Sequence, residues 1–331
     1  MRRNILLLPI LAALLALTWL QSPVPKGSPE FSFAIEPLPL PPRPVAQAHL
    51  GPFLLSGAWE LRSDSERFGG YSSLVPMPDG QLLMFSDGGR WLQFSPPGAD
   101  VLPPDQGNLL RERGRAKETR DVEAATRDPV SGAIWLGLES TNTIARLNRR
   151  LGTLGTVDPP SLSRWGVNSG PESMAKLQDG RFVLLREAFV GWLQEFRHDA
   201  VAFPGDPVAM PLSGRHFRMD GPRHFKPTDM AQLPDGRILV LMRRLVWPMP
   251  QRFAGRIAIG DPALLEPGRA WHLTEVARIP STLPVDNFEG MAVVPGPGRK
   301  VTVWLISDDN YSNFQRTVLW RLEVDPSDLP G

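Results

Sequence analysis

Residues 172–187 read ESMAKLQDGRFVLLRE: a polar opening, a short apolar segment, an Asp-Gly turn and a second apolar segment. The same order recurs in residues 229–243, DMAQLPDGRILVLMR, and, with a turn at Gly296 to Gly298 in place of Asp-Gly, in residues 289–308, EGMAVVPGPGRKVTVWLISD. An Asp-Gly pair between two apolar runs is a strong signal for a tight turn that joins antiparallel strands. The repeated unit therefore predicts β-sheet, and no segment after residue 50 has the periodicity of an amphipathic helix.

Five copies of this unit follow one another along the chain. Their openings, at Ser73, Glu123, Glu172, Asp229 and Glu289, are 50, 49, 57 and 60 residues apart. This spacing matches a four-stranded propeller blade of about 40–50 residues with loop insertions. The sequence therefore predicts an all-β chain that forms a single β-propeller of five or six blades. Residues 53–62 are the expected strand that closes the ring.

The N-terminal part of the chain has a different composition. Arg2 and Arg3 precede an apolar run over residues 5–20, which is typical of a secretory signal peptide or an uncleaved N-terminal anchor. Eight prolines between residues 23 and 44 indicate an extended linker. We therefore expect a signal or anchor in residues 1–22, a linker in 23–50 and the propeller in 51–331. The expected location is periplasmic or secreted, with or without anchoring to the inner membrane by residues 5–20.

Composition excludes several classes of function. The 36 Lys and Arg residues balance 35 Asp and Glu residues, and no basic run is present, which argues against a nucleic-acid partner. The chain has no cysteine, so disulfides, a thiolate nucleophile and Cys-ligated zinc are excluded. Any chemistry must therefore use oxygen and nitrogen groups.

Acidic residues occupy four of the five openings. The first strand of each blade lines the central channel of a propeller, so equivalent residues converge there. Carboxylates that meet in a channel repel one another unless they take up protons or bind a cation. Calcium is the expected cation because it accepts six to eight oxygen ligands in loose geometry. The predicted ligands are Glu123, Glu172, Asp229 and Glu289; the alternative is that these residues cap turns or pair with arginines.

A second polar ring is expected where the second strand of each repeat ends, at Asp87, Glu139, Glu187, Arg243 and Asp308. Asp308, Asp309 and Asn310 follow an apolar strand and suit either a metal or a bound substrate, although these residue types also form turns. Arg243 and Arg316 are candidates to bind an anionic group through paired hydrogen bonds.

Several of these segments together resemble the bacterial phytase-like propeller family, which is described as having esterase-like activity. The resemblance covers about residues 53–324, and its most specific part is the C-terminal block. The segments that carry it are residues 68–73 (FGGYSS), 85–91 (FSDGGRW), 227–231 (PTDMA), 287–292 (NFEGMA), 307–310 (SDDN) and 315–317 (QRT). The resemblance implies a secreted or periplasmic propeller that hydrolyses phosphate or carboxylic esters with the help of calcium. Alkaline phytases also have Lys-rich phosphate sites, whereas this chain has five lysines, which argues against phytate as the substrate.

Two functions follow from these observations. The first is a hydrolase with a small-molecule ester or anionic ligand as substrate, in which channel carboxylates and Asp87 hold the metal. Asp308, Asp309, Arg243 and Arg316 are then the predicted catalytic and substrate-binding residues. The second is a non-catalytic propeller of the cell envelope that binds a ligand or a protein and holds a structural metal.

Overall fold

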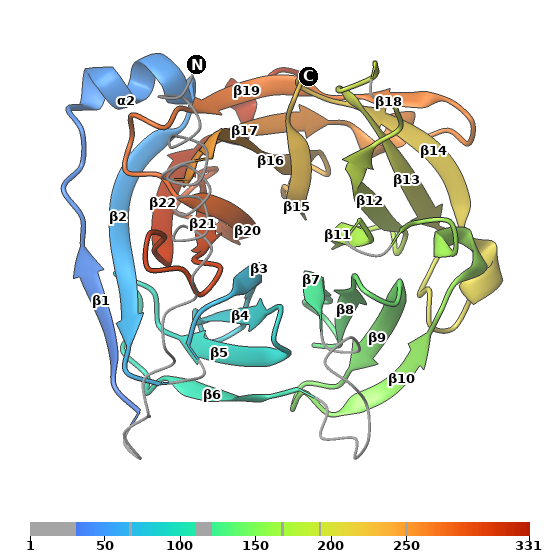
Figure 1. Ribbon diagram of the computed structural model, residues 1–331, viewed down its shortest axis with the longest axis horizontal. Helices are drawn as coiled ribbons and strands as arrows, with labels where there is room; N and C mark the ends of the chain where they lie inside the picture. The colour runs from blue at the N-terminus through green and yellow to red at the C-terminus, as the bar shows by residue number, and fades with distance from the viewer. Residues whose placement is uncertain (1–30, 66–67, 110–120, 167–168, 192, 249–250) are drawn as a thin grey trace, which may run out of the picture.

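The computed structural model describes residues 31–65, 68–109, 121–166, 169–191, 193–248 and 251–331. The strands form five sheets, antiparallel except for one parallel edge pair, that surround a common axis as the blades of a propeller (Figure 1). The predicted all-β propeller is confirmed, and the described residues build five blades.

Each blade begins with an innermost strand and continues outward in antiparallel order. Blade 1 contains β3 (Tyr71–Pro76), β4 (Leu82–Ser86), β5 (Arg90–Phe94) and β6 (Asp105–Asn108). Blade 2 contains β7 (Val122–Arg127), β8 (Ile134–Leu138), β9 (Thr143–Leu147) and β10 (Thr153–Val157). Blade 3 contains β11 (Pro171–Lys176), β12 (Phe182–Phe189), β13 (Arg197–Phe203), β14 (Arg215–Asp220) and the parallel edge strand β18 (Ala270–His272). Blade 4 contains β15 (Lys226–Gln232), β16 (Ile238–Pro248), β17 (Gln251–Gly260) and β19 (Thr274–Ile279). Blade 5 contains β20 (Asn287–Pro295), β21 (Val301–Asp308), β22 (Val318–Val324), β2 (Leu54–Ser63) and β1 (Phe33–Pro37).

The core lies between the blades. Five buried apolar clusters each join residues of two neighbouring sheets. Alternate residues of β4 show how this arises, because Leu82 and Met84 pack against blade 5 whereas Leu83 and Phe85 pack against blade 2. A strand that is buried on both faces needs apolar residues at every position. This explains the continuous apolar second segment of each repeat.

The N-terminal strand β2 closes the ring, as predicted for residues 53–62. It pairs with the C-terminal strand β22, with Leu54 opposite Glu323 and Glu60 opposite Val318. The structure differs from the expected linker over residues 23–50, because β1 and a helix, α2 (Arg43–Leu50), lie within it. Proline is compatible with both elements, since β1 is an edge strand and Pro44 lies in the first turn of the helix. The ring is thus complete within residues 33–324.

The predicted signal or anchor in residues 1–22 lies outside the described residues. None of the helices in the described part of the chain has the length and apolar character needed to cross a bilayer.

Candidate functional site: the acidic entrance of the channel

Every innermost strand has a β-bulge at the same point. The register between the first two strands shifts at Tyr71/Ser73, Val122/Ala124, Pro171/Ser173, Pro227/Asp229 and Phe288/Gly290. A bulge inserts one residue and re-aims its side chain. The inserted residues form what we call the bulge ring: Ser72, Glu123, Glu172, Thr228 and Glu289. The innermost strands contact one another in a closed cycle, so these five positions surround the channel (Figure 1).

Three of the four predicted carboxylate ligands belong to this ring, and Asp229 does not. The position equivalent to Glu289 is Thr228, and Asp229 lies one residue further along the strand. Its two oxygens accept the N–H groups of Met230 (2.8 Å) and of Met291 on blade 5 (2.7 Å), and the side chain is fully buried. Asp229 therefore joins two blades. The predicted position was wrong by one residue. The shared Met-Ala begins one residue after Asp229 but two residues after Glu172 and Glu289, so Thr228 is the residue equivalent to these glutamates.

The predicted second ring is in register in the structure. In each blade, one of these residues lies where the second strand stops pairing with the first strand: Asp87, Glu139, Glu187, Arg243 and Asp308. We call these five the strand-end ring. A third set, two residues before each bulge, completes the entrance: Gly70, Asp121, Gly170, Lys226 and Asn287.

Carboxylates gather on the side of the entrance formed by blades 2 and 3. Oxygens of Asp121, Glu123 and Glu139 all lie within 4.8 Å of one another. Glu139 and Glu172, on neighbouring blades, lie close enough for each to affect the pKa of the other. The N–H of Gly170 lies 3.4 Å from Glu139 Oε1, and the hydroxyl of Ser140 donates to Asp121. No ion pair within the described residues involves any of these four carboxylates, which we call the carboxylate cluster.

Burial and mutual repulsion raise the pKa values of this cluster. The low-polarity surroundings raise the pKa of Glu123 well above its usual range, and the charges of Glu172 and Glu289 add to the effect. Burial also raises the pKa of Glu172 strongly and that of Glu139 to a lesser extent, with neighbouring carboxylates contributing. These three glutamates are therefore close enough to interact, and they favour either bound protons or a bound cation.

The opposite side of the entrance, formed by blades 3 to 5, is neutralised by cations. Arg243 Nη1 lies 2.7 Å from Glu289 and donates to Asn287 Oδ1 at 2.5 Å, while Nη2 lies 3.4 Å from Glu187. Lys226 Nζ lies 3.3 Å from the other oxygen of Glu187. Burial raises the pKa of Glu289 to about 7, against the opposing effect of Arg243. Arg243 is thus engaged by protein carboxylates.

The loop after β21 fixes the blade 5 to blade 1 side. Asp309 accepts the N–H groups of Gly70 and Tyr311 and the hydroxyl of Thr317, each at 3.0 Å. Tyr311 has a left-handed backbone (φ 50°), and its phenol donates to Asp87 Oδ1 at 3.0 Å. A Cβ on Gly70 would meet both Asp87 and Tyr311 at 2.5 Å, so only glycine fits there.

Asp308 lies in this entrance and Arg316 lies beside it. Asp308 is buried, and its pKa is raised well above the usual range by burial and by Glu289, Asp309 and Asp87. The side chain of Arg316 is 41% exposed and lies 3.8 Å from Glu60 and 3.9 Å from Asp286. Its nearest acidic partners are therefore outside the three rings.

Asp121 and Tyr311 are among the entrance residues that were not predicted from the sequence. Asp121 could have been found, because Asp121-Val122-Glu123 has the same spacing as Asn287-Phe288-Glu289, and residues two apart on a strand share a face. Tyr311 could not, because its position depends on a loop that carries no repeat signal.

Comparison with known proteins identifies a family. A family model described as "Phytase-like: Esterase-like activity of phytase" matches residues 66–311. Comparison with curated proteins gives no match. Among solved structures, a chain of Kuenenia stuttgartiensis hydrazine synthase is 12% identical with a TM-score of 0.36, covering 73% of this chain and 57% of that one. Myxococcus xanthus glutaminyl cyclase is 13% identical with a TM-score of 0.43, covering 77% and 91% of the two chains. Since the family model spans most of the propeller, the chain belongs to the phytase-like family.

Proposed function

We propose that the protein is a divalent-metal-assisted ester hydrolase whose metal is held by the carboxylate cluster. The observation that carries this proposal is the contrast in charge around one entrance. Within the described residues, the four carboxylates of the cluster form no ion pair, and Arg243 only partly offsets the raised pKa of Glu172, while Glu187 and Glu289 are paired with Lys226 and Arg243. Membership of a family described by esterase-like activity supports hydrolysis as the reaction class.

The donor set suits a hard cation such as calcium. All side-chain donors of the cluster are carboxylate oxygens, which calcium prefers, and nitrogen or sulfur donors are absent from these four residues. Asp121, Glu123 and Glu139 would hold the ion, and Glu172 would complete the set from the next blade. When bound, such a cation supplies Lewis acidity toward an ester oxygen and activates water.

The other entrance residues would bind the substrate and move protons. Glu289 has a pKa of about 7, which suits a group that gains and loses a proton near neutral pH. Arg243 holds Glu289 in place, and buried Asp308 lies close enough to influence its charge. Arg316, beside the entrance, is the candidate contact for an anionic substrate group. Calcium as the ion, and a periplasmic or secreted location, stay predictions.

The test is turnover of chromogenic carboxylic and phosphate esters by the purified protein, with calcium and with chelator. We expect turnover with calcium, its loss with chelator, and a loss of at least about 100-fold in Glu139→Gln, because a ligand should matter more than the outer-shell groups that typically change activity 10–100-fold. Glu266→Gln is the matched control, since Glu266 is exposed and pairs only with Arg269.

Two results separate the alternatives. Bound calcium without turnover of any ester would favour the non-catalytic binding propeller with a structural metal. Turnover that is unchanged by chelator and by Glu139→Gln would contradict the metal-assisted mechanism.

A further inference from the structure

Arginines without an acidic partner gather at the outer rim where blades 2 and 3 meet. They are exposed, and within the described residues they form no ion pair: Arg149, Arg150, Arg164 and Arg215. Burial lowers the pKa of Arg127, and the positive charge of nearby Arg149 lowers it further. Two acidic residues of this region are engaged elsewhere, because Asp206 pairs with Arg146 and Asp128 with Lys176.

Three loop segments make this rim continuous. A Cβ on Gly155 would lie 3.1 Å from Val208, which places the start of β10 against the loop before β14. The helical turns η2 (Pro160–Leu162) and η3 (Pro211–Ser213) contact each other. Residues 149–155, 160–164 and 206–215 therefore form one surface, which we call the blade 2/3 rim.

Large apolar side chains project from the same surface. Leu212 is 81% exposed, Leu154 58% and Met210 47%, and Val130 on the adjacent turn is 85% exposed. Exposed apolar residues among unpaired arginines are typical of proteins that lie on a membrane surface, where the apolar groups enter the acyl boundary and the cations meet anionic headgroups.

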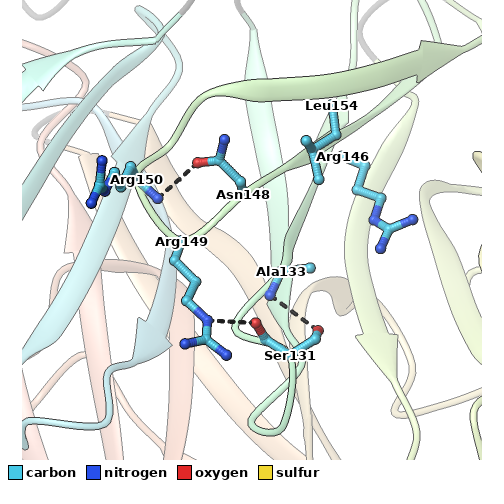
Figure 2. Close-up of a pocket in the computed structure, with 7 residues that line it drawn as sticks. All are labelled: Ser131, Ala133, Arg146, Asn148, Arg149, Arg150 and Leu154. Carbon is cyan, nitrogen blue, oxygen red and sulfur yellow. Dashed lines mark hydrogen bonds between the residues drawn. The ribbon is translucent and has the colours of Figure 1, made fainter.

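A pocket of about 390 Å³ opens within this rim (Figure 2). Figure 2 shows the side chains of Arg146, Arg149 and Arg150 extending in three different directions around Asn148 and Leu154. Arg149 donates from Nε to the carbonyl of Ser131 at 2.7 Å, and its terminal nitrogens have no acceptor among the residues that the structure describes. Arg146 pairs with Asp206 at 2.9 Å, so Arg149 and Arg150 are the two arginines of this pocket that have no acidic partner within the described residues.

We propose that the blade 2/3 rim binds the surface of a bilayer that contains anionic phospholipids. The argument is charge complementarity: four unpaired arginines face solvent beside four exposed apolar side chains. A soluble polyanion would match the arginines and leave the apolar residues exposed to water. Binding here is independent of hydrolysis, because the rim lies on the outer edge of blades 2 and 3 and the proposed active site lies at the channel entrance.

The test uses residues 31–331, since the ring closes within residues 33–324 and the apolar N-terminal run would bind lipid by itself. Sedimentation with vesicles of phosphatidylcholine, with and without 30% phosphatidylglycerol, measures binding. We expect at least about tenfold tighter binding to the anionic vesicles, and loss of that preference in 0.5 M salt because surface electrostatics are screened.

Charge-reversal variants locate the surface. Arg149→Glu with Arg150→Glu should reduce binding to anionic vesicles at least tenfold. The control pair, Arg223→Glu with Arg252→Glu, changes net charge equally at two exposed arginines that also form no ion pair, and it should bind as the parent does. Leu154→Ser with Leu212→Ser should weaken binding at low salt. Equal binding to both vesicle types, or an equal loss in both charge-reversal pairs, would overturn the proposal.

Discussion

The two sides of the channel entrance are built from the same repeat positions. On one side the carboxylates form ion pairs with cationic side chains, and on the other side they form none within the described residues. On blades 4 and 5, Arg243 and Asn287 hold Glu289, and Lys226 shares Glu187 with Arg243. On blades 2 and 3, the positions equivalent to Lys226 and Arg243 are acidic or glycine. Within the described residues Glu123 and Glu172 therefore form no ion pair, and Arg243 only partly offsets the rise in the pKa of Glu172. The ring of carboxylates is therefore not a single site. The side whose carboxylates form no ion pair within the described residues is the side that can bind an external cation.

Removing the cation of the neutralised side should have the largest effect on stability. Arg243→Met leaves Glu289 and Glu187 without their shared partner in a buried setting. We expect a loss of about 3–5 kcal/mol in the free energy of unfolding, as for other broken buried pairs. Urea denaturation measures it. A loss below about 1 kcal/mol would show that Arg243 does not balance these carboxylates.

Acid should destabilise the protein through a different group, His198, which is fully buried on blade 3. Burial lowers its pKa to about 4, and Nε2 lies 3.2 Å from the carbonyl of Phe225. The unfolded chain takes up a proton below about pH 6.5 and the folded one only near pH 4, so stability falls as pH drops through this window. The full effect is about 3 kcal/mol.

Denaturation midpoints between pH 7 and pH 4 measure this effect. Between pH 7 and pH 4, the denaturation midpoint of the His198→Phe variant should change less with pH than that of the parent protein. An unchanged slope would show that another group titrates in this range.

The carboxylate cluster predicts the opposite pH dependence. Because burial raises the pKa values of Glu123 and Glu172 in the cluster, and of Glu289 beside it, the folded metal-free protein holds protons that the unfolded chain releases. In chelator, this contribution to stability is present below about pH 4.5 and is lost as pH rises toward and above 7. Calcium should reverse the loss, so the calcium-induced rise in Tm should be larger at pH 8 than at pH 5. Thermal denaturation at the two pH values measures it, and an equal rise would contradict the cluster as the site.

The smallest of these effects is expected for Asp229, which does not belong to the bulge ring. Asp229→Ala leaves the N–H groups of Met230 and Met291 without an acceptor and should cost about 1–3 kcal/mol of stability. Calcium affinity should not change, because Asp229 is not in the bulge ring. Calorimetry of the variant checks both, and weakened calcium binding would return Asp229 to the ligand set.

The repeat made the architecture predictable, while the site was predictable only in part. Asp-Gly turns and doubly buried second strands are local signals, so the blades and the closing strand followed from the sequence. The strand-end ring was also in register, because it follows directly from the apolar strands. Asp229 was misplaced because it is the acidic residue beside the bulge, whereas the Met-Ala that follows places Thr228 at the position of Glu172 and Glu289. Pairing of Glu289 with Arg243 depends on the contact of two blades, which the spacing of repeats does not specify.

Calcium titration by calorimetry, with Glu139→Gln and Glu187→Gln compared against the parent protein, shows whether the carboxylate cluster holds the metal. These two glutamates occupy equivalent strand-end positions on neighbouring blades, one in the unpaired cluster and one between two cations. The account predicts one calcium per chain, an affinity loss above about 100-fold in Glu139→Gln and little change in Glu187→Gln. Equal losses in both variants, or no calcium binding by the parent protein, would contradict it.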